Sequence, residues 1–180
     1  AKAKYAAALA NWQGLADKLK AEGKPVPRQP ADPSRELGGN HRPGNIFAGV
    51  VHPTLGYGIK GVIWYQGESN AGRGEDPRNY QLKTQALVDG WRETWMQPEL
   101  PFYFVQLPAF NDTATGWIRL REEQRRSLAI KHSGMAVTID LRDADIHPAN
   151  KLDVGDRLAR WALAKTYSQT IPFSGPLFKT

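Results

Sequence analysis

The segment from Asp140 to Pro148 combines a histidine with several nearby carboxylates, a pairing that can act as a base. A carboxylate that accepts the Nδ1 proton of His147 fixes the imidazole tautomer and stabilises the imidazolium. Nε2 is then left to take a proton from a nucleophile. Three aspartates compete for this role, and we favour Asp145, two residues before His147, over Asp143 and Asp140. The alternative is that Asp145 and His147 only shape a turn before Pro148.

A second group of hydrogen-bonding side chains follows the apolar run from Val62 to Tyr65, and consists of Gln66, Glu68, Ser69 and Asn70. If this run is a central strand of an open parallel sheet, the turn after it lies at the carboxyl end of the strand, where such folds bind ligands. The sequence therefore predicts that these side chains line a crevice. The alternative is a purely structural polar turn, in which Ser69 or Asn70 caps the next segment.

Ser69 is also a candidate nucleophile. Together with Gly67 it fits the first glycine and the serine of the G-x-S-x-G turn, but Ala71 occupies the position of the second glycine. Because alanine is sometimes tolerated at that position, the pattern leaves this role open as an alternative.

No metal or cofactor site is expected. The histidines lie far apart, without the spacing of a metal-binding pair, at His41, His52, His132 and His147. The segment 72–74 lacks the lysine and the glycine spacing of a phosphate-binding loop. The absence of cysteine excludes disulfides, thiolate metal sites and a cysteine nucleophile within this sequence.

The composition favours one folded domain, or most of one, because 180 residues with 41% hydrophobic content can bury a sizeable core. No run of 18 or more apolar residues is present, so no membrane association is expected. The net charge of +6 could favour nucleic acid, but basic and acidic residues are mixed, as in residues 121–126. We interpret that stretch as a solvated helix face and expect no nucleic-acid partner.

Strands and helices alternate after residue 43. Apolar runs rich in β-branched and aromatic residues predict strands at Val62–Tyr65, Phe102–Leu107 and Met135–Ile139. Helical spacing predicts helices over Tyr80–Trp95, Ile118–Lys131 and Asp153–Tyr167, with Asp153 as the cap of the last. This order indicates an α/β fold with parallel strands joined by right-handed crossovers.

Residues 1–43 follow a different pattern. One apolar stripe predicts a helix over the first 22 residues, formed by Tyr5, Leu9, Trp12, Leu15 or Ala16, and Leu19. Residues 24–43 contain five prolines and no periodicity, which predicts an irregular connection. We expect residues 1–43 to be an insertion, and we expect further polypeptide before them.

The two polar loops together resemble a known family. The segment Ile59–Ala71, followed by Trp91–Arg92, Pro101–Tyr103, Val105–Leu107 and Asp145–Pro148, is similar to the sialate O-acetylesterases of the SGNH hydrolase superfamily. The resemblance covers about residues 42 to 167, since Arg42–Phe47 and Val51–Pro53 are also similar to the segment that precedes these motifs in bacterial members.

The resemblance implies a flavodoxin-like three-layer α/β/α sandwich with a parallel sheet. It also implies a serine esterase that removes acetyl groups from sugar hydroxyls through an acyl-enzyme. The implied site residues are His147 as the base, Asp145 as its partner, Gln66 as a side-chain donor to the oxyanion, and Glu68, Ser69 and Asn70 as supporting residues. Members of the superfamily commonly carry aspartate three residues before the histidine, where this chain has Ala144.

In the resembled family the nucleophilic serine lies in a Gly-Gln-Ser-Asn-Met-like block, and a Gly-Gly block supplies an oxyanion-hole amide. Neither block is recognisable in these 180 residues. The resemblance therefore implies that residues 44–180 are the C-terminal part of the esterase domain, incomplete at the N-terminus and inactive by themselves. The implied partners are the N-terminal part of the same domain and an acetylated sugar or glycan. An acetyl xylan esterase and a non-catalytic glycan-binding relative are the alternatives, and the family suggests a periplasmic or secreted location.

Overall fold

Contacts within the chain divide it into two units, Ala1–Tyr57 and Gly58–Thr180. The computed structural model describes residues 2–32, 42–72, 75–110, 115–142 and 145–176. The sequence boundary that we predict at residue 43 falls close to the undescribed residues 33–41 and stays a prediction.

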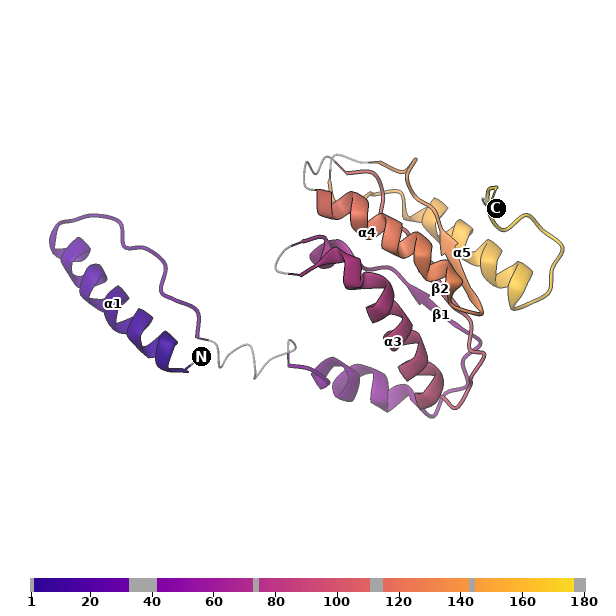
Figure 1. Ribbon diagram of the computed structural model, residues 1–180, viewed down its shortest axis with the longest axis horizontal. Helices are drawn as coiled ribbons and strands as arrows, with labels where there is room; N and C mark the ends of the chain where they lie inside the picture. Colours follow the sequence, from indigo (N-terminus) through magenta and orange to yellow (C-terminus); the bar gives the residue numbers. More distant parts are fainter. Residues whose placement is uncertain (1, 33–41, 73–74, 111–114, 143–144, 177–180) are drawn as a thin grey trace. The chain divides into compact units, whose positions relative to one another are not determined.

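The first unit begins with helix α1, Lys2–Ala21, as its apolar spacing predicts. The sequence leaves open whether Leu15 or Ala16 belongs to the apolar stripe of this helix. In the structure Ala16 is buried, at 2% exposure, whereas Leu15 is 48% exposed. The extended segment after the helix runs back along it (Figure 1). The Trp12 indole Nε1 joins the two by donating a hydrogen bond to the Pro27 carbonyl at 2.8 Å. A π-helical turn, Phe47–Val51 (η1), and a 3-10 turn, His52–Thr54 (η2), follow later in this unit.

The second unit contains a parallel sheet of three strands in the order β1 (Val62–Trp64), β2 (Phe102–Val105) and β3 (Ser133–Ala136). The predicted parallel pairing is confirmed. Among the described strands β2 is central and β1 lies at an edge, where its Ile63 is 68% exposed, so a central position of Val62–Tyr65 stays a prediction. Strand β3 begins and ends earlier than predicted, and Val137 and Ile139 beyond it are exposed.

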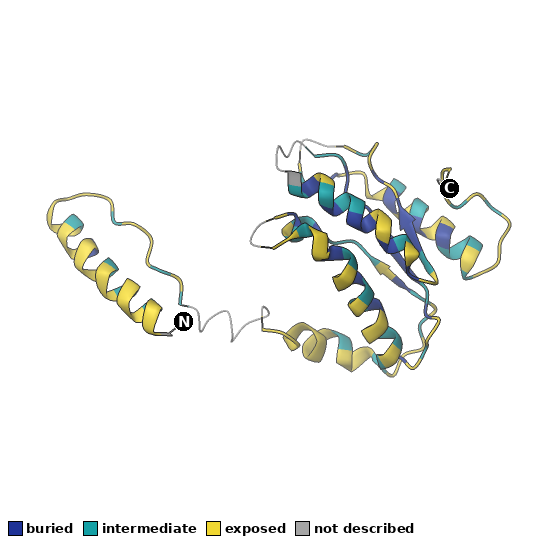
Figure 2. Cartoon of the chain, in the orientation of Figure 1, coloured by how far each residue is buried: buried dark blue, intermediate teal, exposed yellow. Residues whose placement is uncertain are grey.

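Helices cover both faces of the sheet (Figure 1). They are α3 (Tyr80–Thr94, preceded by the 3-10 turn Pro77–Asn79, η4), α4 (Thr115–Arg126, followed by the 3-10 turn Ser127–Ala129, η5) and α5 (Lys151–Lys165). Successive side chains of β2 point to opposite faces. Phe102 meets Trp91 of α3 edge-on at 6.4 Å between ring centroids, whereas Tyr103 stacks on Trp161 of α5 at 6.2 Å. Buried residues accordingly gather on the strands and on the inward faces of these helices (Figure 2).

Two predicted details of the helices are wrong. The charged stretch 121–126 is not one solvated face, because Glu123 and Gln124 are 2% and 1% exposed. A helix turns 100° per residue, so six consecutive residues cannot all face solvent on a helix that packs against a sheet. The cap of α5 is Asn150, whose Oδ1 accepts a hydrogen bond from the backbone N–H of Asp153, rather than Asp153 itself.

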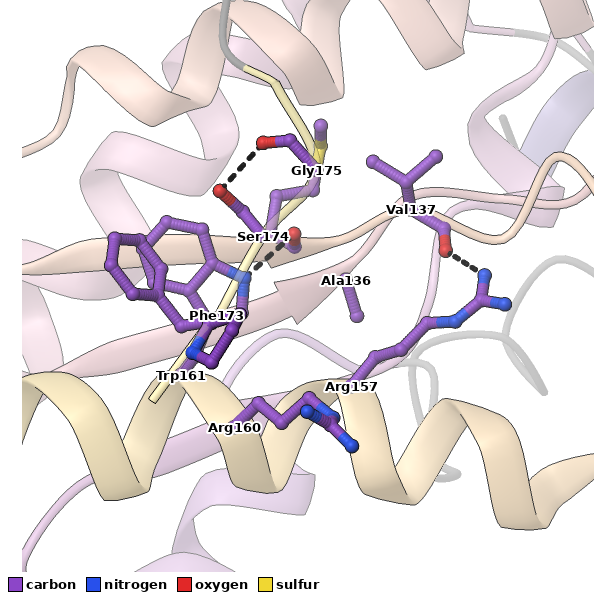
Figure 3. Close-up of a pocket in the computed structure, with 10 residues that line it drawn as sticks. Ala136, Val137, Arg157, Arg160, Trp161, Phe173, Ser174 and Gly175 are labelled. Atoms are coloured by element: carbon purple, nitrogen blue, oxygen red, sulfur yellow. Dashed lines mark hydrogen bonds between the residues drawn. The ribbon is translucent and has the colours of Figure 1, made fainter. Parts of the chain in front are cut away.

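Side chains of α5 close the outer edge of β3. The backbone carbonyl of Met135 accepts a hydrogen bond from the Trp161 indole at 2.9 Å, and that of Val137 accepts one from the Arg157 guanidinium at 2.6 Å (Figure 3). An edge strand with unpaired carbonyls is a template for pairing with another strand. These two side chains occupy the carbonyls that such a strand would need.

The close approach of Trp161 leaves no room for a side chain at Gly134 in β3. A Cβ at Gly134 would lie 2.4 Å from the Trp161 ring atoms Cδ2 and Cε3. We expect Gly134→Ala to lower the free energy of unfolding by about 1–3 kcal/mol, the usual cost of overpacking a core, in urea unfolding of the chain. The matched control is Gly155→Ala in α5, where no heavy atom lies within 4 Å of the added Cβ and where alanine favours the helix by about 1 kcal/mol. Equal stability of Gly134→Ala and the parent would contradict this account of the packing.

Candidate active site

The two polar loops follow parallel strands, and both therefore lie at the carboxyl-terminal end of the sheet. Tyr65 and Ile146, one from each loop, pack against a shared apolar cluster formed by Ala71, Tyr80, Leu107, Trp117 and Leu120. The cluster is thus the common support of the Gln66 turn and of the segment that carries His147.

His147 and Asp145 are in contact. The Asp145 Oδ1 atom lies 3.2 Å from His147 Nδ1 and accepts the His147 backbone N–H at 2.7 Å. Both side chains are exposed, at 73% for His147 and 69% for Asp145. The contact engages Nδ1 and leaves Nε2 available, which is the arrangement that a base requires. The catalytic role of the pair stays a prediction.

The other aspartates considered for this role differ in their surroundings. Both carboxylate oxygens of Asp140 are bound by Arg157, each at 2.6 Å. This hydrogen-bonded ion pair lowers the pKa of Asp140. Asp143 and Ala144 lie outside the described residues. Among the described aspartates, Asp145 is the one that touches His147.

Gln66 is held at both its backbone and its side chain. The Tyr80 hydroxyl faces both oxygens of Gln66, at 2.7 Å from the backbone O and 3.3 Å from Oε1. The Gln66 amide nitrogen Nε2 donates to Asn70 Oδ1 at 2.7 Å. The carboxamide therefore has a defined position with its nitrogen on the Asn70 side.

The supporting residues form a 3-10 turn, Glu68–Asn70 (η3). The Glu68 carboxylate accepts the backbone N–H of Gly67 at 2.9 Å, and Asn70 Nδ2 donates to Glu75. Ser69 is exposed, and among the described residues its hydroxyl has no hydrogen-bond partner. A nucleophilic serine needs a base within hydrogen-bond reach. No such contact supports the alternative reading of Ser69 as the nucleophile.

Gln124 ties the ends of two strands together behind this turn. Its Nε2 atom donates to the carbonyls of Val105 at 3.2 Å and Gln66 at 3.4 Å, and its Oε1 accepts the Leu107 backbone N–H at 2.9 Å. The turn packs so tightly here that a Cβ on Gly67 would lie 3.1 Å from Gln124 Nε2. The polar turn is therefore anchored to buried groups.

Sequence reasoning did not single out Tyr80, Gln124 or Glu75. Helical spacing places Tyr80 on the apolar face of the predicted helix over residues 80–95, and the mixed charges of residues 121–126 predict a solvated face for Gln124. One signal was present: Gln124 lies seven residues after Trp117 and four after Leu120, which places an amide on the apolar face of α4. A buried polar side chain must find hydrogen bonds, so an inward glutamine marks a network.

Burial raises the pKa of both tyrosines near the turn, Tyr65 and Tyr80, and the nearby charge of Glu68 raises it further. Both phenols therefore keep their protons at neutral pH, and Tyr80 remains a hydrogen-bond donor to Gln66.

In the part of the chain that the structure describes, no group of three or more His, Asp or Glu side chains has the arrangement of a metal site. None of the described helices is long and apolar enough to cross a membrane.

Comparisons with known proteins point to one class. Residues 49–164 match the family model described as carbohydrate esterase, sialic acid-specific acetylesterase. The chain is 33% identical over 169 residues to the sialate O-acetylesterase of Mus musculus and 32% identical over 181 residues to that of Homo sapiens. These matches cover 82% and 88% of this chain but 31% and 34% of the relatives, so the chain spans about a third of their length.

The structure is also similar to a solved one, the crystal structure of a carbohydrate acetylesterase from Xanthomonas citri. The TM-score is 0.73 at 38% sequence identity, and the match covers 82% of this chain and 36% of that one.

Proposed function

The chain belongs to the carbohydrate esterase family of sialic acid-specific acetylesterases, and from this premise we propose that it supplies part of the active site of a serine esterase that removes acetyl groups from sugar hydroxyls. The observation that carries the proposal is the contact of His147 Nδ1 with the Asp145 carboxylate, in a loop at the same end of the sheet as Gln66. The nucleophilic serine comes from polypeptide outside these 180 residues.

In the proposed reaction, His147 Nε2 takes the proton from the serine hydroxyl as its oxygen attacks the acetyl carbonyl carbon. The imidazolium is stabilised by Asp145, and the oxyanion of the tetrahedral intermediate accepts a hydrogen bond from Gln66 Nε2. Collapse of the intermediate breaks the ester bond, and His147 returns the proton to the leaving sugar oxygen. Water then attacks the acetyl-serine by the same steps and releases acetate.

We also propose that the three strands are one part of a larger flavodoxin-like α/β/α sheet. The two edges of the described sheet differ in a way that supports this. The β3 edge is closed by Trp161 and Arg157, whereas β1, among the described residues, pairs with β2 and with no strand on its other side. Further strands of the same domain would continue the sheet from β1.

The experiment compares acetate release by the 180-residue chain with release by the full-length protein that carries the nucleophile. O-acetylated sialic acid and an aryl acetate serve as substrates. We expect release by the full-length protein and none by the 180-residue chain. Equal rates of acetate release in both would contradict the proposal that the nucleophilic serine lies outside these 180 residues.

Two further outcomes decide between functions. Saturable binding of an acetylated glycan by the full-length protein, with no acetate released, would favour a non-catalytic relative over an esterase. A strong preference for acetylated xylan over acetylated sialic acid would identify a different sugar ester as the substrate.

A further inference from the structure

A glutamine that donates to an oxyanion must be held in one of two orientations. A carboxamide has nearly the same shape when it is flipped, but one end donates hydrogen bonds and the other accepts them. A flipped Gln66 would present an oxygen to the negative charge of the intermediate. The surroundings of the Gln66 side chain therefore decide whether it helps or hinders the reaction.

The contacts of Gln66 define its orientation from one side. A carboxylate only accepts hydrogen bonds, and Glu75 is paired with Lys83. Asn70 must therefore turn its Nδ2 toward Glu75, which leaves Oδ1 facing Gln66. Gln66 in turn donates from Nε2 to this oxygen at 2.7 Å. In the flipped state, two acceptor oxygens would face each other at this contact.

The opposite side of Gln66 is held by Tyr80, which donates to its backbone and, more weakly, to its carboxamide oxygen. Tyr80 is 6% exposed, and its hydroxyl lies 3.3 Å from Gln66 Oε1 while it also donates to the Gln66 backbone O. The phenol carries one proton, which the backbone O at 2.7 Å and Oε1 at 3.3 Å share, so its donation to the carboxamide oxygen is the weaker of the two. Of the two Nε2 hydrogens, one is used by Asn70, and among the described residues no second acceptor takes the other.

We propose that Tyr80 and Glu75 are positioning residues that hold the Gln66 carboxamide in the orientation that leaves one Nε2 hydrogen for the oxyanion. Tyr80 acts directly on Gln66, and Glu75 acts through Asn70. The inference rests on the proposed role of Gln66 in the esterase. It adds that this role depends on two side chains that do not themselves touch the reacting acetyl group.

The test is Tyr80→Phe and Glu75→Gln in the full-length protein, assayed for acetate release. Tyr80→Phe removes the donor, and Glu75→Gln replaces a strict acceptor with an amide that can turn either way. We expect kcat to fall roughly three- to tenfold in each, the rate equivalent of one neutral hydrogen bond, with KM changed less than about twofold. An unchanged kcat in both variants would overturn the proposal.

Matched controls separate positioning from stability. Tyr103→Phe also removes a partly buried phenol hydrogen bond, the one to Thr166 at 2.8 Å, but beside α5 on the opposite sheet face. Glu22→Gln breaks another exposed lysine–glutamate pair, with Lys24. Both controls should keep the parent kcat. A fall in their kcat equal to that of the test variants would show a general effect of destabilisation and overturn the proposal.

A double-mutant cycle shows whether Tyr80 and Glu75 act through Gln66. In a Gln66→Ala background, Tyr80→Phe and Glu75→Gln should have no further effect on kcat, because the side chain that they orient is gone. The same fold-loss in both backgrounds would sink the inference. If Gln66→Ala itself leaves kcat unchanged, the proposed oxyanion role fails. If kcat responds to Gln66 but not to Tyr80 or Glu75, the positioning inference alone fails.

Discussion

His147→Ala in the full-length protein is expected to lower kcat/KM for acetate release by at least about a thousandfold, because the serine hydroxyl then has no base to take its proton. The expectation rests on the contact of Nδ1 with Asp145, which leaves Nε2 for the nucleophile. The same variant should bind an acetylated sugar about as tightly as the parent, because the base acts mainly in the transition state. Acetate release over a range of substrate concentrations gives kcat/KM and KM. KM reports the binding of the sugar, because chemistry is slow in this variant.

The control for this variant is His132→Asn. His132 is a partly exposed histidine at the start of β3, at the opposite end of the strand from the His147 loop. Its backbone φ is 55°, a left-handed conformation that asparagine tolerates better than alanine. This variant should retain the parent rate. Full activity in His147→Ala would refute the role assigned to His147.

Gln66→Ala is expected to lower kcat on the order of a hundredfold or more, the typical cost of removing one oxyanion donor. KM should change little, since the hydrogen bond strengthens as charge develops on the oxygen. Gln66→Glu keeps the shape of the side chain but replaces the donor with a negative charge, so its kcat should fall further. Steady-state kinetics with an aryl acetate measure these effects.

Gln85→Ala serves as the control for Gln66→Ala. The Gln85 amide lies on α3 and donates to Asp89 four residues later, away from the polar loops. Its loss should leave kcat unchanged. Parent-like kcat in both Gln66 variants would remove the oxyanion role from this side chain.

Local patterns predicted most elements of the second unit, and the errors share one cause. Val137 and Ile139 have high strand propensity, yet the pairing of β3 with β2 ends at Ala136 and leaves both exposed. Propensity reports which residues suit a pleated surface, whereas the partner strand decides where pairing begins and ends. The end of strand β3 was therefore set by its pairing with β2 and not by local propensity.

The burial of charged and amide side chains was also beyond local patterns. Residues 121–126 look like a solvated run by composition, but the sheet beneath α4 takes Glu123 and Gln124 inward. Gln124 then bonds to groups at positions 66, 105 and 107, which lie 17 or more residues away in sequence. Hydrogen bonds across such separations follow from packing.

The sequence by itself determined the residue types available for chemistry, the parallel α/β order and the membership of an acetylesterase family, because periodicity and motif spacing are local properties of the chain. The preference for Asp145 as the partner of His147 was already in the sequence, whereas tertiary structure decided that Arg157 occupies Asp140 and that Tyr80 and Gln124 hold Gln66. The physical reason is that a hydrogen bond has a direction and a length of about 3 Å. Only the folded backbone brings donors and acceptors from different segments within that reach.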